Sequence, residues 1–384
     1  MRTAFTDLVG VPQPIVGFNR SPGVVAAVSN AGGLGVLAAS AYTPEELDAQ
    51  LTWIEEQVGG KPYGVDLLVP EKFVPGDPDD LIASLRAQIP EQHLMFVRGL
   101  LDQYRIPELA VLDDNSGIVA GLNPGGAEAL LDVAFSHRIS LVASALGTPP
   151  PGLVARGKAA GVVVAALVGQ ARHAQRQIEA GVDLLIAQGT EAGGHTGTIA
   201  TMVLTPEIVD IAGGRPVLAA GGIASGRQMA AALALGAAGV WCGSVWLASA
   251  EDVANQAIKD KFLGAASSDT LRSPTRTGKP ARQLRSAWHD EWDRPDAPVP
   301  LPMPLQPMLV DAAWQRIDQA AAAGHPGALR LESFYVGQVV GSFRQIRPAA
   351  EITRLMVADC EARIAELARL LAPAAGLGGS APAR

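Results

Sequence analysis

A glycine-rich loop that ends in a histidine is the feature of this sequence best suited to chemistry. Residues 187–197 read A-Q-G-T-E-A-G-G-H-T-G, with four glycines in the last nine residues. Glycines let a backbone approach a ligand closely, and the imidazole of His195 can donate, accept or move a proton near neutral pH. We therefore expect His195 to be the catalytic group. A solvated histidine on a glycine-rich surface loop is the alternative interpretation.

Two more glycine motifs are suited to binding an anion. Residues 219–226 read A-A-G-G-I-A-S-G, and residues 242–246 read C-G-S-V-W. Free backbone N–H groups at glycines and at a helix N-terminus bind an anion without a lysine, and a serine hydroxyl adds one donor. The two motifs together predict a phosphate-binding site made by Gly221, Gly222, Gly243 and Ser244.

Three other reactive side chains lie on or beside these motifs. Glu191 is the carboxylate nearest to His195 in the sequence, and two interpretations stay open for it. It orients the histidine or binds the ligand, or it is a solvated loop charge. Cys242 has no basic neighbour to activate it, so we expect it to fill the core. Asp183 begins a predicted strand at the opposite end from the loops, and we expect it to be structural.

Eight short apolar runs alternate with helix-like stretches. The runs are continuous rather than alternating, which is typical of parallel strands that are buried on both faces. Several intervening stretches end in Ala-Gly-Val, where Gly161, Gly181 and Gly239 can take the left-handed conformation that ends a helix. Eight such units predict an α/β protein with a closed (β/α)8 TIM barrel, and an open doubly wound sheet is the alternative. The predicted strands are 14–17, 35–38, 63–68, 140–145, 162–167, 183–188, 216–220 and 239–242.

The barrel positions the three motifs at one edge. Active sites on this fold lie at the C-terminal ends of the strands, and the loops after strands seven and eight commonly build a phosphate site. The loop with His195 follows predicted strand six, and the two anion-binding motifs follow strands seven and eight. The pattern therefore predicts that all three motifs meet around one ligand.

Two segments do not fit the repeat of strand and helix. We expect the barrel to span 1–251, with a helical insertion at about 71–138 after strand three. Helix-like pieces stand there at 79–88 and 126–135. A mostly helical C-terminal extension follows at 252–372, with a final amphipathic helix that starts at Pro348. The glycine-rich tail 373–384 is predicted to be disordered.

The composition excludes several classes of function. The chain has 384 residues and a net charge of −8, which argues against a nucleic-acid surface. Its two cysteines have no metal-ligand or disulfide spacing, so no metal site is expected. No run is apolar for the roughly 20 residues that a membrane span needs, and the N-terminus lacks a signal-peptide core. We expect a cytoplasmic protein without a membrane partner.

As a set, the motifs resemble the nitronate monooxygenase family, formerly called 2-nitropropane dioxygenases. The loop 187–197 is the family's most specific motif, and 219–227 and 236–244 match its phosphate-binding part. Supporting matches are V-P-Q-P-I-V-G, N-A-G-G-L-G-V-L and K-P-Y-G-V-D-L-L near the N-terminus. The resemblance covers about residues 8–70 and 139–251.

The resemblance implies a cofactor and a reaction. Members of this family are barrel enzymes that use FMN and oxidise nitronates, in some cases nitroalkanes, with molecular oxygen to a carbonyl compound and nitrite. His195 would be the base that takes the proton beside the nitro group, and the flavin would carry the electrons. The residues implied to bind FMN are Gly17, Phe18, Asp66, Gln188, Gly193, Gly194, Gly221, Gly222, Gly243 and Ser244.

The chain departs from the family pattern at several places. Asp66 stands where members often have asparagine, and Ser144 stands where some have lysine. The insertion and the extension resemble a longer bacterial branch. One alternative function is therefore an FMN-dependent NAD(P)H reductase of quinones or enoyl thioesters. A second is a non-redox scaffold that binds a phosphate ligand or a flavin. The apolar final helix can pack on its own barrel or on a second copy, which leaves a homodimer open.

Overall fold

Eight parallel strands close into a barrel in the computed structural model, which describes residues 1–67, 78–109, 124–144 and 147–371. Strand β9 pairs with β1, so that Trp241 lies opposite Val16 and no edge is left open. The closed barrel confirms the predicted (β/α)8 fold and excludes the open sheet. In barrel order the strands are β1 (Ile15–Asn19), β2 (Leu34–Ala38), β3 (Tyr63–Leu67), β4 (Leu141–Ser144), β5 (Val163–Val168), β6 (Leu184–Gln188), β8 (Val217–Ala220) and β9 (Gly239–Cys242).

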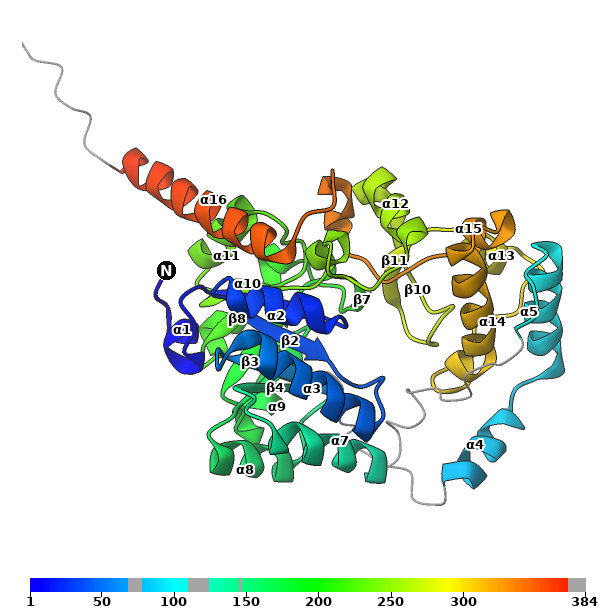
Figure 1. Cartoon of the computed structure of the whole chain (residues 1–384), viewed down its shortest axis with the longest axis horizontal. Helices are drawn as coiled ribbons and strands as arrows, with labels where there is room; N and C mark the ends of the chain where they lie inside the picture. The colour runs from blue at the N-terminus through cyan, green and yellow to red at the C-terminus, as the bar shows by residue number, and fades with distance from the viewer. Residues whose placement is uncertain (68–77, 110–123, 145–146, 372–384) are drawn as a thin grey trace, which may run out of the picture.

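Helices connect the strands and surround the barrel (Figure 1). Two of the predicted glycine stops are confirmed, since α8 and α9 end at Gly161 and Gly181 with φ of 69° and 87°. The stop at Gly239 is wrong, because Gly239 lies within β9 and the helix before it ends at Ala234. The connecting helices are α2 (Pro22–Asn30), α3 (Pro44–Val58), α7 (Pro124–Ser136), α8 (Pro151–Ala160), α9 (Ala171–Ala180), α10 (Thr201–Ile211) and α11 (Gly226–Ala234).

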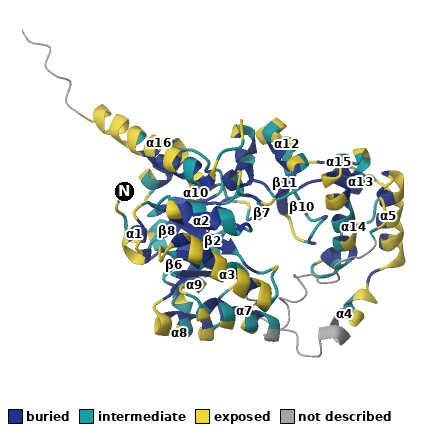
Figure 2. Ribbon diagram, viewed as in Figure 1, coloured by how far each residue is buried: buried dark blue, intermediate teal, exposed yellow. Residues whose placement is uncertain are grey.

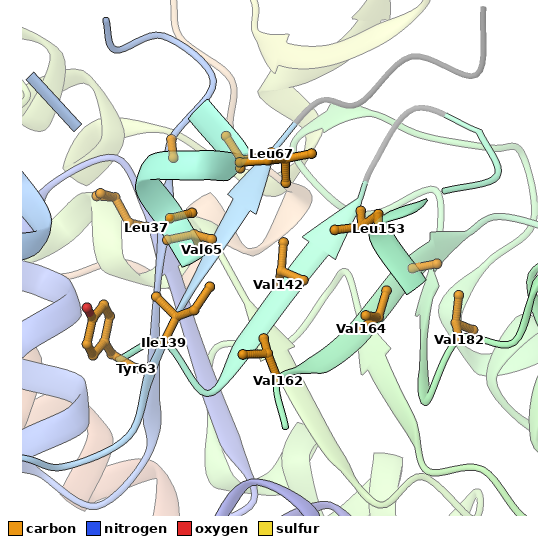
Figure 3. Packing of buried hydrophobic residues seen from close by; sticks show 14 of the residues in the cluster. Leu37, Tyr63, Val65, Leu67, Ile139, Val142, Leu153, Val162, Val164 and Val182 are labelled. Atoms are coloured by element: carbon orange, nitrogen blue, oxygen red, sulfur yellow. The ribbon is translucent and has the colours of Figure 1, made fainter. Parts of the chain in front are cut away.

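The strands bury both of their faces, as their continuous apolar sequences predict. Leu37, Val65, Val142 and Val164, on β2 to β5, point outward into the layer between sheet and helices (Figure 3). The alternate residues fill the barrel interior, where helix α1 (Ala4–Val9) adds Phe5. Complete burial of one such side chain contributes about 1.5–3 kcal/mol to stability. Because side chains fill the barrel interior, a ligand can reach the barrel only at its ends.

The last helix of the chain completes the ring of helices. Helix α16 (Ala349–Leu370) packs on α11 and also contacts α2, so it fills the position of the eighth barrel helix (Figure 1). The contact is close: a Cβ added to Gly226 would lie 2.2 Å from the backbone N of Cys360. The sequence pattern assigns this helix to the C-terminal extension. In the structure α16 is the barrel helix of the last unit, and the rest of the extension is inserted between β9 and α16.

The predicted insertion after strand three divides into two parts. Helix α7 packs against α3 and β3 as an ordinary barrel helix. Helices α4 (Pro78–Arg86) and α5 (Glu91–Gln103) leave the barrel, and α5 packs on α14 (Leu305–Ala322). Residues 71–77 and 110–123 of the predicted insertion lie outside the described residues, as does the predicted tail 373–384.

The extension forms a second core beside the barrel, which Figure 2 shows as buried residues around α14. Trp288 and Trp292 on α13 (Ala287–Trp292) pack with Trp314 on α14. Helix α15 (Pro326–Leu331) covers the same core. Helix α12 (Gln256–Gly264) and three 3-10 helices, η1 (Ser244–Ala248), η2 (Ser267–Asp269) and η3 (Gln338–Ser342), connect this core with the barrel. None of the described helices is long and apolar enough to span a membrane.

A small antiparallel sheet joins the extension to the barrel. Strands β10 (Thr270–Ser273) and β11 (Ala281–Leu284) form a hairpin, and β11 pairs with β7 (Gly194–His195). The sequence predicted a mostly helical extension and gave no sign of these strands. Strands of four residues with mixed polar and apolar side chains have too short a pattern to be recognised, and here their pairing with the glycine-rich loop defines them.

Candidate active site

Three predicted cofactor residues point into the barrel at its carboxyl end. Phe18 packs with the interior cluster, and its ring centroid lies 5.6 Å from that of Trp241. Val65 and Leu67 face the helices, so Asp66 between them faces the interior. Gln188 follows Leu184 and Ile186 on the inward face of β6 by the same alternation.

Gly17 is needed for helix packing. A Cβ at this position would lie 2.6 Å from Cγ2 of Val28 on α2, so the missing side chain faces outward. Only the backbone of Gly17 is therefore available to a ligand at the end of the barrel. The prediction that Gly17 lines a flavin stays a prediction, restricted to its main-chain atoms.

Asp66 is a buried carboxyl group without a compensating charge. Its exposed fraction is 6 %, and within the described residues no hydrogen bond or ion pair of its side chain is seen. Burial raises the pKa of Asp66 to about 7, because a carboxylate loses its hydration inside the barrel. At neutral pH this group is therefore available as a hydrogen-bond donor or as an acid.

The anion-binding motifs lie side by side, since Ala220 at the end of β8 pairs with Trp241 on β9. Gly221 and Gly222 have φ of 97° and 72°, a left-handed conformation that favours glycine. In the described part of the chain, no protein acceptor is seen for the backbone N–H groups of these two glycines, or for those of Gly243 and Ser244 at the start of η1. Four free donors at adjacent strand ends fit a phosphate.

The side chain of Ser244 already has one partner. Its Oγ accepts a hydrogen bond of 2.8 Å from the backbone N–H of Gly337. Gln338 N donates to Glu191 O at 2.9 Å, which holds the same segment against the histidine loop. The Ser244 hydroxyl proton stays available for an anion. The segment 336–338 has no recognisable motif, so sequence reasoning missed it.

Gly193 explains the close approach of that segment. A Cβ on Gly193 would lie 2.9 Å from the carbonyl carbon of Val336, a contact that real side chains do not make. The glycine is therefore required by packing of the extension on the loop. Gly194 has φ of 76° and pairs with Arg282 of β11. Both glycines shape the loop, and direct cofactor contacts of either stay a prediction.

Glu191 is a helix cap. Its carboxylate accepts hydrogen bonds from Thr201 N at 2.9 and 3.1 Å and from Thr201 Oγ1 at 2.9 Å, at the first residue of α10. A carboxylate there satisfies free N–H groups and interacts favourably with the helix dipole. The carboxylate is therefore paired with α10 rather than freely solvated, and no contact between Glu191 and His195 is seen among the described residues; the interpretation that Glu191 binds the ligand stays open. Asp183 is structural as expected, since its carboxylate accepts from Val164 N at 2.9 Å.

His195 is held by the hairpin of the extension. It lies opposite Ala281 of β11, and its Nε2 is 2.8 Å from Oγ1 of Thr277. The residue is exposed, yet burial by the surrounding protein, with the charge of Lys279, lowers the pKa of the imidazole. The imidazole is therefore neutral at pH 7 and able to accept a proton.

Two arginines of the hairpin fix the loop on either side of the histidine. Arg282 Nε donates to Thr190 O at 2.8 Å, and Arg272 Nη2 donates to Thr196 O at 2.7 Å. Sequence reasoning missed both, because their partners are backbone carbonyls 92 and 76 residues away in the chain. The loop that carries His195 is thus positioned by the extension as well as by strand β6.

Two further expectations concern nucleophiles and metals. Cys242 is buried, and burial raises the pKa of its thiol to about 12, as expected of a core residue. No group of three His, Cys, Asp or Glu side chains with the geometry of a metal site occurs among the described residues. The described carboxyl end thus presents the imidazole of His195, the carboxyl group of Asp66, the amide of Gln188 and a set of N–H donors.

Comparisons with known proteins place this chain among the nitronate monooxygenases and their relatives. The model of the family described as nitronate monooxygenase matches residues 3–359. A candidate monooxygenase of Mycobacterium tuberculosis is 56% identical over 94% of this chain and 96% of its own. A hydroxy-methyl-oxo-octahydroindene-carboxyl-CoA dehydrogenase of Rhodococcus jostii is 34% identical over 74% of this chain and 66% of its own.

Solved structures agree with the sequence relatives. Nitroalkane oxidase from Streptomyces ansochromogenes superposes with a TM-score of 0.76 at 29% identity, over 95% of this chain and 100% of its own. The region matched by the family model includes the barrel, the hairpin and the first half of α16. This chain therefore belongs to the nitronate monooxygenase family of oxidoreductases.

Proposed function

We propose that this protein is an FMN-dependent enzyme that oxidises nitronates and neutral nitroalkanes with molecular oxygen, giving a carbonyl compound and nitrite. The observation that carries the proposal is the position of His195. A neutral imidazole lies on the loop after β6, and N–H groups without a visible protein acceptor lie at the ends of β8 and β9, the next two strands of the barrel. Family membership supports an oxidoreductase, and the substrate and the base are our proposal.

The residues at the carboxyl end fit a flavin with a terminal phosphate. The N–H groups of Gly221, Gly222, Gly243 and Ser244 would hold the phosphate, for which four donors at two adjacent loops are suited. Phe18 and Gln188 would line the ring system, and Asp66 would face its polar edge. When bound, the flavin would supply the electron transfer.

His195 would act on the proton beside the nitro group. A nitroalkane is a carbon acid, and its deprotonation needs a base whose conjugate acid has a pKa near or below the working pH. Lowering of the His195 pKa keeps the imidazole neutral at pH 7, so the base is present in its active form. A preformed nitronate has already lost this proton, and His195 would then serve only to orient it.

The cofactor and the reaction can be tested on the purified protein. We expect a yellow protein whose flavin is bleached by ethyl nitronate in anaerobic stopped-flow mixing and is reoxidised by oxygen with release of nitrite. NADH should bleach it slowly. If NADH bleaches the flavin quickly and ethyl nitronate does not, the proposed function is wrong.

The reductase of quinones or enoyl thioesters is the second candidate. One observation favours it: the name of the Rhodococcus jostii relative states a CoA thioester as substrate. Fast bleaching by NADH, followed by reoxidation with a quinone or an enoyl thioester, would establish this function. A protein that stays colourless after incubation with FMN would favour a non-redox scaffold.

A further inference from the structure

The contacts of the Thr277 hydroxyl group indicate which ring nitrogen of His195 carries the proton. Thr277 lies in the turn between β10 and β11, 82 residues beyond the histidine in the chain. Its hydroxyl oxygen is 2.8 Å from Nε2 of His195, 3.1 Å from the carbonyl oxygen of Lys279 and 3.4 Å from the backbone N of Lys279. One hydroxyl group therefore has three polar neighbours.

Only one arrangement of protons satisfies all three contacts. A hydroxyl group has one proton to donate and two lone pairs to accept with. The carbonyl of Lys279 can only accept, so it takes the Thr277 proton, and the N–H of Lys279 donates to one lone pair. The second lone pair is left for His195, whose Nε2 must then carry a proton. We infer that Thr277 is a positioning residue that fixes the neutral His195 with its proton on Nε2 and its basic lone pair on Nδ1.

This inference rests on the proposed function and specifies the atom that performs it. Nδ1 accepts the proton from the carbon beside the nitro group, the C–H electron pair forms the C=N bond, and the negative charge moves onto the nitro oxygens. The Nε2–H···Oγ1 bond of 2.8 Å is present before and after the transfer. It becomes charge-assisted, and hence stronger, when His195 is protonated. Thr277 thereby stabilises the product of proton transfer without touching the substrate.

The other charged groups near His195 are engaged elsewhere. Arg272 and Arg282 donate to backbone carbonyls of the loop, and Glu191 caps α10. Lys279, on the same turn as Thr277, is the charge that lowers the pKa of His195 in addition to burial. The turn between β10 and β11 thus controls both the orientation of the imidazole and the pH range in which it is neutral.

The tautomer can be measured without any substrate. Long-range proton–nitrogen correlation spectra of protein with nitrogen-15-labelled histidine distinguish a protonated ring nitrogen from a bare one, and the spectrum of H195N identifies the His195 signals. Above the His195 pKa, we expect Nε2 to carry the proton and Nδ1 to be bare. The opposite assignment, or an equal mixture of tautomers, would overturn the inference whatever the substrate is.

Variants of Thr277 test the consequence for turnover. T277V keeps the shape and loses the acceptor, so turnover of a neutral nitroalkane should fall about 10- to 100-fold, the value of a hydrogen bond to a charged group. The acid limb of the pH profile should move to lower pH, since protonated His195 is less stabilised. T277S retains the hydroxyl and should restore both.

The outcomes separate a positioning role from a structural one and from failure of the proposed function. Equal losses on nitroalkane and preformed nitronate in T277V, without a shift of the acid limb, indicate a merely structural threonine and overturn the inference. If the wild type oxidises neither substrate, the proposed function is wrong, and the tautomer measurement still decides the role of Thr277. Flavin absorbance and melting temperature of T277V and T277S show whether both variants fold.

Discussion

His195 meets two requirements of a base that removes a proton from carbon. The imidazole is accessible on the loop after β6, and burial together with Lys279 lowers its pKa below the ordinary value. Activity that depends on this base is lost as the pH falls through the pKa of His195. The acid limb should therefore lie below about pH 6.5, the ordinary value for histidine.

Replacing His195 by asparagine separates the base from the binding site. H195N should keep the flavin, because the phosphate-binding groups lie on other loops. Turnover of neutral nitroalkanes should fall about 10²- to 10⁴-fold, the usual loss of general-base catalysis, with a much smaller effect on preformed nitronates. Steady-state kinetics with ethyl nitronate and nitroethane measure both. Equal losses on the two substrate forms would contradict the assignment as base.

Asp66 gives a second prediction at the residue scale, on stability. The ordinary pKa of Asp is about 3.9, and that of Asp66 is raised to about 7. The folded state thus holds its proton more tightly than the unfolded state, so stability falls as pH rises between these values, and the penalty is complete above about pH 7. D66N removes the penalty, and its melting temperature should exceed that of the wild type by more at pH 8 than at pH 5. An equal difference at both values would argue against a buried titrating carboxyl group.

At the scale of elements, the proposed anion site at the ends of β8 and β9 depends on backbone geometry. Gly222 provides a free N–H group in the left-handed region. G222A should cost about 1 kcal/mol of stability, because a side chain is strained at positive φ, and should weaken FMN binding. Gly214, with φ of 84° and open space around it, is the matched position away from the site.

The control variant G214A introduces the same backbone strain, an alanine at positive φ, away from the proposed anion site. G214A should lose a similar amount of stability and bind FMN as the wild type does. Thermal melting and fluorescence titration with FMN provide the two measurements. If both variants bind FMN equally well, the N–H groups after β8 do not hold the phosphate.

At the scale of the whole molecule, the end of the chain closes the barrel's outer layer. Helix α16 crosses α11 where Gly226 permits backbone contact, and a Cβ there would lie 2.2 Å from Cys360 N and 2.5 Å from Met356 O. Backbone atoms cannot move aside as a flexible side chain can. G226A should therefore destabilise the protein by about 1–3 kcal/mol, the range for an overpacked core, and expose the amide protons of α16 to exchange.

A glycine in a helix with free space beside it provides the matched control. Gly264, the last residue of α12, has no atom within 4 Å of an added Cβ. G264A should leave stability unchanged or slightly raised, since alanine is the better helix former. Hydrogen exchange and thermal melting distinguish the two. If G226A and G264A behave alike, the close packing of α16 on α11 is not what holds the last helix in place.

The sequence by itself determined the features that have a local signature. Eight apolar runs predicted the eight strands and their parallel order, because burial on both faces leaves a continuous hydrophobic run. The glycine motifs predicted the sharp turns after β8, where Gly221 and Gly222 take the left-handed conformation that favours glycine whatever the remainder of the fold does. The sequence also predicted that His195 follows β6, because the glycine-rich loop comes directly after the sixth apolar run.

Only the tertiary structure decided which residues support this site. Thr277 meets His195 across 82 residues, and Gly337 meets Ser244 across 93. Contacts of this kind leave no periodicity or motif, because each partner is selected by geometry that exists only after the chain has folded. The same holds for α16, which completes the ring of helices from the far end of an inserted segment. The chain thus encodes its glycine-rich loops locally, while the arrangement that fixes the histidine arises when the extension folds back onto the barrel.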